Sequence, residues 1–340
     1  MKDTHLSLSQ KRSNNIFILG IETSCDETSI GIVKNNQLLV NLIASQEKIH
    51  TCFGGIVPEL ASRAHLEKII PIFNTATKTA GILPEQIDAI GVTNTPGLKG
   101  SLMVGVAFAN GLGYSLKKPV YNVNHLSAHL AACYFDSSIQ FPALGLVISG
   151  GHTSLFLLHS HTDMKLIGKT RDDACGEVFD KVGRMMNLPF PGGAYIEKLA
   201  QKGNEKRIKF PKAYIKDSLD FSFSGIKTAV YYYISKHGAE NPADIAASFQ
   251  KTMTDSILAK INDAIDLYPV KNFLFGGGVI RNSYMRNRIT GHLARRNVRA
   301  IIPEPSLCAD NGGKIAIFTR YLILSGAKPS PYRISVVPTQ

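Results

Sequence analysis

The sequence of 340 residues has no apolar run long enough to cross a membrane. Its longest apolar runs, such as 143–149, have the length of a strand, whereas a spanning helix needs about 20 apolar residues. Residues 1–15 are polar and lack the apolar stretch of a secretory signal. We therefore expect a soluble protein of the cytoplasm with a disordered tail at 1–15, and an organelle transit peptide is the alternative for that tail.

Cysteine is scarce, and its pattern argues against a disulfide-stabilised protein. The five cysteines are widely scattered, and none forms a Cys-x-x-Cys pair. An odd number at such spacing is typical of a reducing compartment, where thiols stay free. We therefore do not expect a disulfide scaffold.

Acidic residues are outnumbered by basic ones, with 26 Asp and Glu against 38 Lys and Arg and a net charge of +12. Clustered basic residues bind polyanions because they release counterions from phosphates. A solvated basic face is the alternative to nucleic acid as the partner. The basic residues form two clusters, the Lys202–Lys216 cluster (Lys202, Lys206, Arg207, Lys209, Lys212, Lys216) and the Arg281–Arg299 cluster (Arg281, Arg286, Arg288, Arg295, Arg296, Arg299).

Two histidines four residues apart, His125 and His129, indicate one half of a metal site. On a helix this spacing places both rings on one face, and Asn124 is a good N-cap for such a helix. The alternative is an ordinary pair of histidines. A zincin protease needs Glu directly after the first histidine, and Leu126 in that place argues against peptide hydrolysis.

The strand and helix pattern indicates an α/β protein, which at this length should form two lobes. Apolar runs at 16–21 and 28–33 bracket a polar bend, and a second pair at 141–148 and 154–158 brackets Ser-Gly-Gly-His-Thr. Further on, a strand at 272–275 runs into three glycines, a joint that suits either a nucleotide or a tight turn.

Seven segments of the chain occur in a fixed order and are informative together. They are Gly20-Ile-Glu-Thr-Ser-Cys-Asp-Glu-Thr28, Val57-Pro-Glu-Leu-Ala-Ser-Arg63, His125-x-x-x-His129, Ser149-Gly-Gly-His-Thr153, Gly176-Glu-Val-Phe-Asp-Lys181, Asp220-Phe-Ser-Phe-Ser-Gly225 and Asp310-Asn-Gly312. With these segments the chain resembles the bacterial TsaD family, the tRNA threonylcarbamoyladenosine transferases, over residues 16–330. The resemblance implies a two-lobed actin-like, sugar-kinase-like fold with central sheets flanked by helices. It implies an N-terminal lobe at 16–135 that ends in the metal-ligand helix, a C-terminal lobe at 136–325 and a tail at 326–340.

The same resemblance implies the composition of the site. Asp310 would join His125 and His129 around one iron(II) per subunit, with zinc as an occupant in vitro. The phosphate and carbamoyl side of the substrate is implied to lie at a loop made of Ile148, Ser149, Gly150, Gly151 and His152.

Four further residues have a functional and a structural interpretation. Asp180, Gly193 and Asn282 are implied to surround the nucleoside of the substrate. The structural alternatives are an ion pair or cap for Asp180, a turn for Gly193 and an N-cap for Asn282. Asp26, at the tip of the first hairpin, could steer or accept a proton in catalysis, and its alternative role is to form the turn.

The activity implied by the resemblance is metal-dependent acyl transfer. Threonylcarbamoyl would pass from threonylcarbamoyl-AMP to the exocyclic amine of adenosine 37 in tRNAs that read codons beginning with A. The implied partners are tRNA, a TsaB-like paralogue and a TsaE-like ATPase, without a membrane. A metallo-endopeptidase and an actin-like ATPase or kinase are the alternatives.

Overall fold

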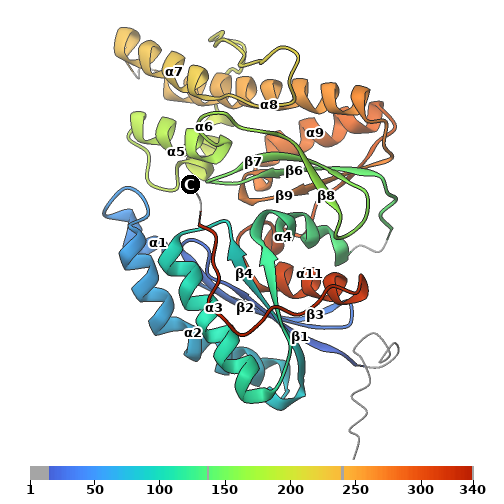
Figure 1. The fold of residues 1–340 in the computed structure, drawn as a ribbon. Coiled ribbons are helices and arrows are strands. Elements are labelled where there is room, and N and C mark those ends of the chain that lie inside the picture. The colour runs from blue at the N-terminus through green and yellow to red at the C-terminus, as the bar shows by residue number, and fades with distance from the viewer. Residues whose placement is uncertain (1–14, 136–137, 239–240, 339–340) are drawn as a thin grey trace, which may run out of the picture. The chain divides into compact units, whose positions relative to one another are not determined.

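The computed structural model describes residues 15–135, 138–238 and 241–338, which form two compact units (Figure 1). The first unit contains 15–135 and 310–338, and the second is Ser138–Ala309. The sequence predicts residues 310–325 in the second lobe, but the structure assigns them to the first unit, because the helix there packs on that unit's sheet. The tail predicted at 1–15 lies outside the described residues except for Asn15.

The first unit contains a five-stranded sheet in the order β3-β2-β1-β4-β5. Strands β1 and β2 form the predicted antiparallel hairpin, and β3 extends it, whereas β4 and β5 run parallel to β1. The strands span β1 Phe17–Glu22, β2 Glu27–Lys34, β3 Gln37–Ser45, β4 Ile87–Thr95 and β5 Val120–Asn124.

Helices cover both faces of this sheet. Helices α2 and α3 lie on one face and α11 on the other (Figure 1). Apolar side chains of these helices pack against the strands. The helices span α1 Glu47–Thr51, α2 Pro58–Ala80, α3 Lys99–Leu116, α4 His125–Ala131 and α11 Gly312–Leu324, with short 3-10 turns at Pro84–Gln86 and Ala132–Phe135.

Glycine allows α11 to begin directly on the sheet. A Cβ added at Gly20 of β1 would lie 2.1 Å from the carbonyl oxygen of Gly312, and one at Gly31 of β2 would lie 2.2 Å from the amide nitrogen of Gly313. Such contacts are possible only without a side chain. They place Asp310, two residues before the helix, beside the ends of β1 and β2.

The segment after α11, predicted as a tail, runs along the first unit where the structure describes it. Ser330 bonds through its backbone amide to the carbonyl of Val120 at 2.7 Å, and the amide of Val337 donates to the carbonyl of Asn94 at 3.0 Å. These backbone bonds fasten the segment to β5 and β4.

The second unit repeats the strand pattern of the first, with a sheet in the order β10-β9-β6-β7-β8. Strands β6 and β7 form the second predicted hairpin, β8 extends it antiparallel, and β9 and β10 run parallel to β6. The prediction of two sheets flanked by helices is therefore confirmed. The strands span β6 Ala143–Ile148, β7 Thr153–Leu158, β8 Met164–Lys169, β9 Asn272–Gly276 and β10 Arg299–Ile301.

Helix α8 (Pro242–Leu267) forms the centre of the second unit's helical layer, since residues along its whole length are buried. It packs against α6, α7 and α9, and its apolar side chains join the core under the sheet. The remaining helices span α5 Cys175–Met185, α6 Gly192–Ala200, α7 Ser224–His237, α9 Ser283–Arg295 and α10 Pro305–Cys308, with a 3-10 turn at Gly278–Arg281.

Two expectations from composition are tested by the structure. All five cysteines are free thiols, as predicted. Among the described residues, no helix combines the length and the apolar character needed to cross a membrane.

Candidate functional site

The two histidines lie on one face of α4, as their spacing predicts. The Asn124 side chain accepts hydrogen bonds from the amides of Leu126 (2.9 Å) and Ser127 (3.1 Å), so the predicted N-cap is confirmed. Both rings are buried, and the Nε2 atoms of His125 and His129 lie 3.2 Å apart. Helix α4 therefore holds two nitrogen ligands close together, one turn apart.

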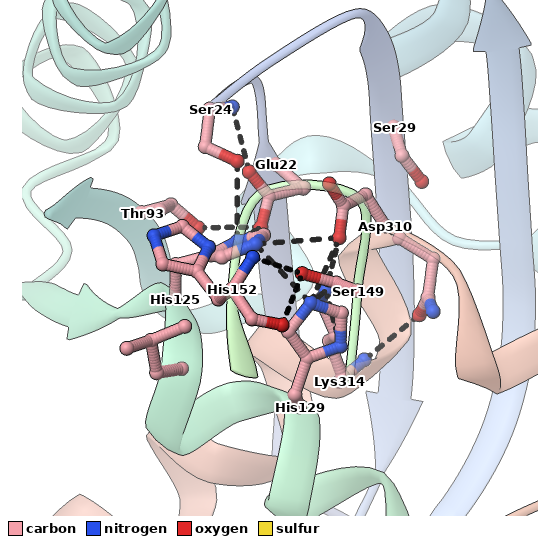
Figure 2. A network of polar contacts seen from close by, with 12 residues as sticks. Glu22, Ser24, Ser29, Thr93, His125, His129, Ser149, His152, Asp310 and Lys314 are labelled. Carbon is pink, nitrogen blue, oxygen red and sulfur yellow. Dashed lines mark hydrogen bonds and ion pairs between the residues drawn. The ribbon is translucent and has the colours of Figure 1, made fainter. Parts of the chain in front are cut away.

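Asp310 completes a three-residue cluster with the histidines (Figure 2). Its Oδ1 lies 3.1 Å from Nε2 of His129 and 3.4 Å from Nε2 of His125. Asn311, the next residue, caps α11 by accepting from the amide of Lys314 at 3.0 Å. This cap fixes the backbone next to Asp310.

Glu22, at the end of β1, orients His125. Its Oε2 lies 2.9 Å from Nδ1 of His125, and its carboxylate accepts from the Thr93 hydroxyl at 2.9 Å and the Ser24 amide at 2.7 Å (Figure 2). Burial opposes ionisation of Glu22, but the interaction with His125 outweighs it and lowers the pKa to about 2. An ionised acceptor at Nδ1 leaves Nε2 as the ligand atom.

Lys314 lies fully buried beside the cluster, with Nζ 2.7 Å from Oδ1 of Asp310 and 3.2 Å from a ring nitrogen of His129. Burial, assisted by the Lys314 charge, lowers the pKa of His129 to about 3. Burial alone would raise the pKa of Asp310, but His125 and Lys314 hold it well below its usual value. The cluster therefore offers a neutral imidazole and an ionised carboxylate.

These residues fit a divalent transition metal. Ligand bonds of about 2.1 Å place neighbouring donors roughly 3.0 to 3.4 Å apart, which is the range of separations found here. Two imidazoles and one carboxylate form the donor set that non-haem iron(II) and zinc accept, with positions left for other oxygens. A carboxylate behind one imidazole is the usual support of such a ligand.

Sequence reasoning missed Glu22 and Lys314 as site residues. Glu22 is a charged residue that ends the buried strand β1, and Lys314 is a lone charge near the start of the apolar helix α11. A charged residue in an apolar run indicates that the charge has a buried partner, but the sequence does not show which residue that partner is.

Asp26 lies in the turn between β1 and β2. Its backbone carbonyl accepts from the amide of Gln46 at 3.0 Å. This contact agrees with its structural role in the turn. A catalytic role for Asp26 stays a prediction.

In the second unit, the loop from Ile148 to His152 connects β6 to β7 in the predicted tip. The Ser149 amide donates to the His152 carbonyl at 2.8 Å, and the His152 amide donates to the Ser149 hydroxyl at 3.1 Å. Within the described residues, the amides of Gly150 and Gly151 have no hydrogen-bond partner, and a Cβ at either glycine would meet no atom within 4 Å. Consecutive unengaged amides of this kind suit an anion.

The triple glycine at the end of β9 packs against this loop through Gly277. Gly277 has φ +96°, and a Cβ there would lie 2.2 Å from the carbonyl oxygen of Ile148. The tight-turn interpretation therefore holds for Gly277. At Gly278 a Cβ would meet no atom within 4 Å, so packing does not explain that glycine.

Asp180 and Gly193 lie together in the second unit. The Asp180 carboxylate accepts from the amide of Gly192 at 2.7 Å and also from that of Gly193, at the start of α6. Burial raises the pKa of Asp180, although these amides oppose the shift. Asp180 thus connects α5 to α6 by hydrogen bonds. A Cβ at Gly193 would come within 3.8 Å of Phe179, which is ordinary van der Waals contact.

Asn282 caps α9, as its structural interpretation predicts. Its side chain accepts from the amide of Met285 at 2.9 Å and donates to Oε1 of Gln250 at 2.7 Å. Gln250 and Ser283 line a cavity of about 260 Å³ that is also lined by Glu197, Glu205 and Tyr284. A contact of Asn282 with substrate stays a prediction.

Each basic cluster has some residues in ion pairs, such as Lys212 with Asp255 in the Lys202–Lys216 cluster. In the Arg281–Arg299 cluster, Arg288 pairs with Asp255 and Arg296 with Asp266. Lys206 and Arg207 of the Lys202–Lys216 cluster are exposed and form no ion pair with the part of the chain that the structure describes. Their charges are therefore available to a polyanion.

Comparison with known proteins gives closely related sequences. A family model described as TsaD, tRNA N6-adenosine threonylcarbamoyltransferase, matches residues 37–317. A protein of that name from Chlamydia trachomatis serovar L2b is 47% identical over 313 residues, 88% of this chain and 91% of the relative. One from Bacillus cereus is 45% identical over 311 residues (89% and 90%), and one from Clostridium novyi is 42% identical over 334 residues (96% and 98%).

Solved structures agree in fold. HypF from T. kodakarensis has a TM-score of 0.64 at 15% identity, over 92% of this chain and 48% of HypF. Component A of (R)-2-hydroxyglutaryl-CoA dehydratase from Acidaminococcus fermentans has a TM-score of 0.56 at 14% identity, over 91% and 99%. Such likeness concerns the fold alone, and it confirms the actin-like, sugar-kinase-like class. With a family model across most of its length and relatives more than 40% identical, this chain belongs to the TsaD family of tRNA N6-adenosine threonylcarbamoyltransferases.

Proposed function

We propose that this protein transfers the threonylcarbamoyl group from threonylcarbamoyl-AMP to the exocyclic amine of adenosine 37 in tRNAs that read codons beginning with A. The observation that carries the proposal is 42% to 47% identity, over 88% or more of the chain, with proteins named for threonylcarbamoyl transfer to tRNA adenosine. The metal-ligand cluster and the open glycine loop supply the groups that such a reaction needs.

The reaction is an acyl substitution on an activated donor. The adenosine amine attacks the carbonyl carbon of the mixed anhydride and forms a C–N bond. The C–O bond to phosphate breaks, AMP leaves with the electron pair, and the amine gives its proton to solvent. Because AMP is a good leaving group, no covalent enzyme nucleophile is needed. Three of the five free cysteines, Cys133, Cys175 and Cys308, are buried, which agrees with a reaction that uses no thiol nucleophile.

The loop of the second unit is assigned to the phosphate of the donor. The unengaged amides of Gly150 and Gly151 would donate to phosphate oxygens, and the hydrogen bonds between Ser149 and His152 hold the loop in shape. Backbone amides held in place before the donor arrives need no reorganisation as negative charge grows on the leaving phosphate.

His125, His129 and Asp310 would hold one divalent ion, which we propose to be iron(II), with zinc able to replace it in vitro. When bound, the ion would act as a Lewis acid toward substrate oxygens. Glu22 keeps His125 in the tautomer that presents Nε2, and the low pKa of His129 keeps its imidazole neutral.

The remaining parts of the proposal concern partners and location. The exposed basic residues of the Lys202–Lys216 cluster would contact tRNA phosphates. A TsaB-like paralogue and a TsaE-like ATPase would assist turnover. Because the proposed substrate is tRNA, we expect the protein to work in the cytoplasm.

Reconstitution tests the proposal directly. The protein would be incubated with threonylcarbamoyl-AMP, iron(II), the TsaB-like and TsaE-like proteins and tRNA, and the nucleosides would be identified by mass spectrometry. We expect threonylcarbamoyladenosine at position 37. Metal-dependent cleavage of a glycoprotein, without any modified nucleoside, would support the peptidase alternative and overturn the proposal.

Variants of the ligand cluster separate metal chemistry from folding. His125→Ala, His129→Ala and Asp310→Ala should each abolish tight metal binding and transfer, while circular dichroism stays that of the wild type. Ser127→Ala, on the same helix between the two histidines, is the matched control and should retain both activities. Stoichiometric metal in a His125→Ala/His129→Ala double variant would rule out this site.

A further inference from the structure

Two adjacent carboxylates, Asp172 and Asp173, join helices α5 and α7 of the second unit. Asp173 accepts a hydrogen bond from Lys181 Nζ of α5 at 2.8 Å, from the Ser224 hydroxyl of α7 at 3.0 Å, and from Lys227 of α7. Asp172 accepts from the Phe223 amide at 2.8 Å, just before α7. The segment between β8 and α5 therefore connects α7 to α5 by side-chain hydrogen bonds.

Two lysines and two carboxylates form the ion pairs of this junction. Lys181 pairs with Asp173 and with Glu177, each at 2.8 Å, and Lys227 pairs with Asp173. Burial opposes ionisation of Asp173, but the hydrogen bonds from Lys181 and Lys227 outweigh it and lower the pKa to about 2. If Asp173 were neutral, Lys181 would keep its ion pair with Glu177, whereas Lys227 would lose its pair with Asp173.

The first turn of α5 lies directly on the proposed phosphate loop. The Gly176 amide donates to the Ser149 carbonyl at 3.1 Å, and the Cys175 amide donates to the Thr153 hydroxyl at 2.9 Å. A Cβ added at Gly176 would lie 2.6 Å from the Ser149 carbonyl oxygen, so the helix and the loop are closely packed. A shift of α5 must therefore move or release the loop.

We propose that Asp173 is a positioning residue, which through Lys181 and Lys227 holds α5 in the place that keeps the Ser149–His152 loop shaped for the phosphate of the acyl donor. The inference rests on the proposed function. It deepens that function by assigning a role to the Asp220-Phe-Ser-Phe-Ser-Gly225 segment, whose last residues supply the α7 side of the junction.

Asp173→Asn tests this role, with Glu177→Gln as its control. Both changes remove one negative charge from Lys181. Within the described residues, however, the polar contacts of Glu177 stay in and beside α5, where it accepts from the Ala174 amide at 3.2 Å and pairs with Lys181. Because small displacements of substrate-binding groups are costly, we expect Asp173→Asn to raise KM for threonylcarbamoyl-AMP about tenfold or more. Affinity for tRNA should stay within about twofold, and Glu177→Gln should leave KM within about twofold.

A second measurement does not depend on turnover. Hydrogen exchange of peptides that cover 148–153 and 174–180 should become faster in Asp173→Asn than in wild type or Glu177→Gln, with peptides of β9 unchanged. If the wild type lacked transferase activity, the proposed function would fail, but faster exchange in the loop would still support the positioning role.

Two further variants keep the inference open to refutation. Lys227→Arg should preserve loop exchange and KM. If Asp173→Asn does not fold, Lys227→Met replaces it as the test variant, because it leaves the ion pair of Asp173 with Lys181 in place. Unchanged KM and unchanged loop exchange, with only a lower melting temperature, would show that Asp173 is merely structural and overturn the proposal.

Discussion

Glu22 Oε2 lies 2.9 Å from Nδ1 of His125, and both side chains are buried. Hydrogen bonds from Thr93 and Ser24 hold the carboxylate in place, so its position does not depend on a metal ion. The protein thereby selects the His125 tautomer that turns Nε2 toward His129 and Asp310.

Glu22→Gln should weaken metal binding without unfolding the protein. The amide keeps the size and an acceptor for Nδ1 but removes the charge, and loss of such a supporting group typically costs about 10-fold to 100-fold in affinity. Competition with a chelator would measure the change. Glu59→Gln, whose carboxylate pairs with Arg63 on the surface, is the control. Wild-type affinity in Glu22→Gln would show that the carboxylate has no part in metal binding.

The metal-free protein should lose stability as pH falls below about 6.5, in part through His65. This buried ring accepts from the Thr28 hydroxyl at 2.8 Å and donates to the Cys25 carbonyl at 3.0 Å, an assignment of protons that suits the neutral form. Burial lowers the pKa of His65 below that of the unfolded chain. The unfolded chain then binds the extra proton, so the stabilisation is present above pH 6.5 and is lost at lower pH.

Urea unfolding between pH 8 and pH 5 measures this effect. His65→Gln should reduce the slope of the free energy of unfolding against pH by up to about 1.4 kcal/mol per unit. An identical slope in wild type and variant would assign the pH dependence to other groups.

Gly277→Ala and Gly278→Ala should differ although the residues are neighbours. At Gly277 the positive φ is unfavourable for any residue with a side chain, and a Cβ would also clash with the Ile148 carbonyl. We therefore expect a loss of stability of at least about 1–3 kcal/mol. At Gly278 nothing obstructs a methyl group, and stability should change by less than about 0.5 kcal/mol. Denaturant unfolding compares the two, and equal losses would contradict the steric argument.

Charge reversal in the Lys202–Lys216 cluster should weaken tRNA binding and reduce its dependence on salt. Each phosphate contact contributes about 0.7 to 0.9 to the slope of log affinity against log salt. Lys206→Glu/Arg207→Glu should therefore lower that slope by about 1.4 to 1.8 if both residues contact phosphates. Metal uptake should not change.

The matched variants are Lys271→Glu, an exposed lysine just before β9, and Arg295→Glu from the second cluster. A shallower slope in Arg295→Glu would assign the second cluster to tRNA as well. Unchanged affinity and slope in all the variants would mean that other residues or partner proteins bind the tRNA.

Much of the secondary structure and part of the site could be predicted from the sequence. The helix that contains His125 and His129 follows from the Asn124 cap and the four-residue spacing, and both hairpins follow from apolar runs around short polar tips. These features depend on hydrogen bonds and side-chain periodicity within a few residues, and such local relationships can be read from the sequence itself.

Only the tertiary structure decided which distant residues support the cluster. Resemblance pointed to Asp310, but local patterns gave no reason to pair Glu22 with His125 or Lys314 with Asp310, because each pair forms only when separate elements pack. The assignment of α11 to the first unit depends in the same way on Gly20, which lets the helix approach β1 without a side chain between them. Close packing between segments far apart in the chain has no local signature, since it depends on the whole sheet being in place.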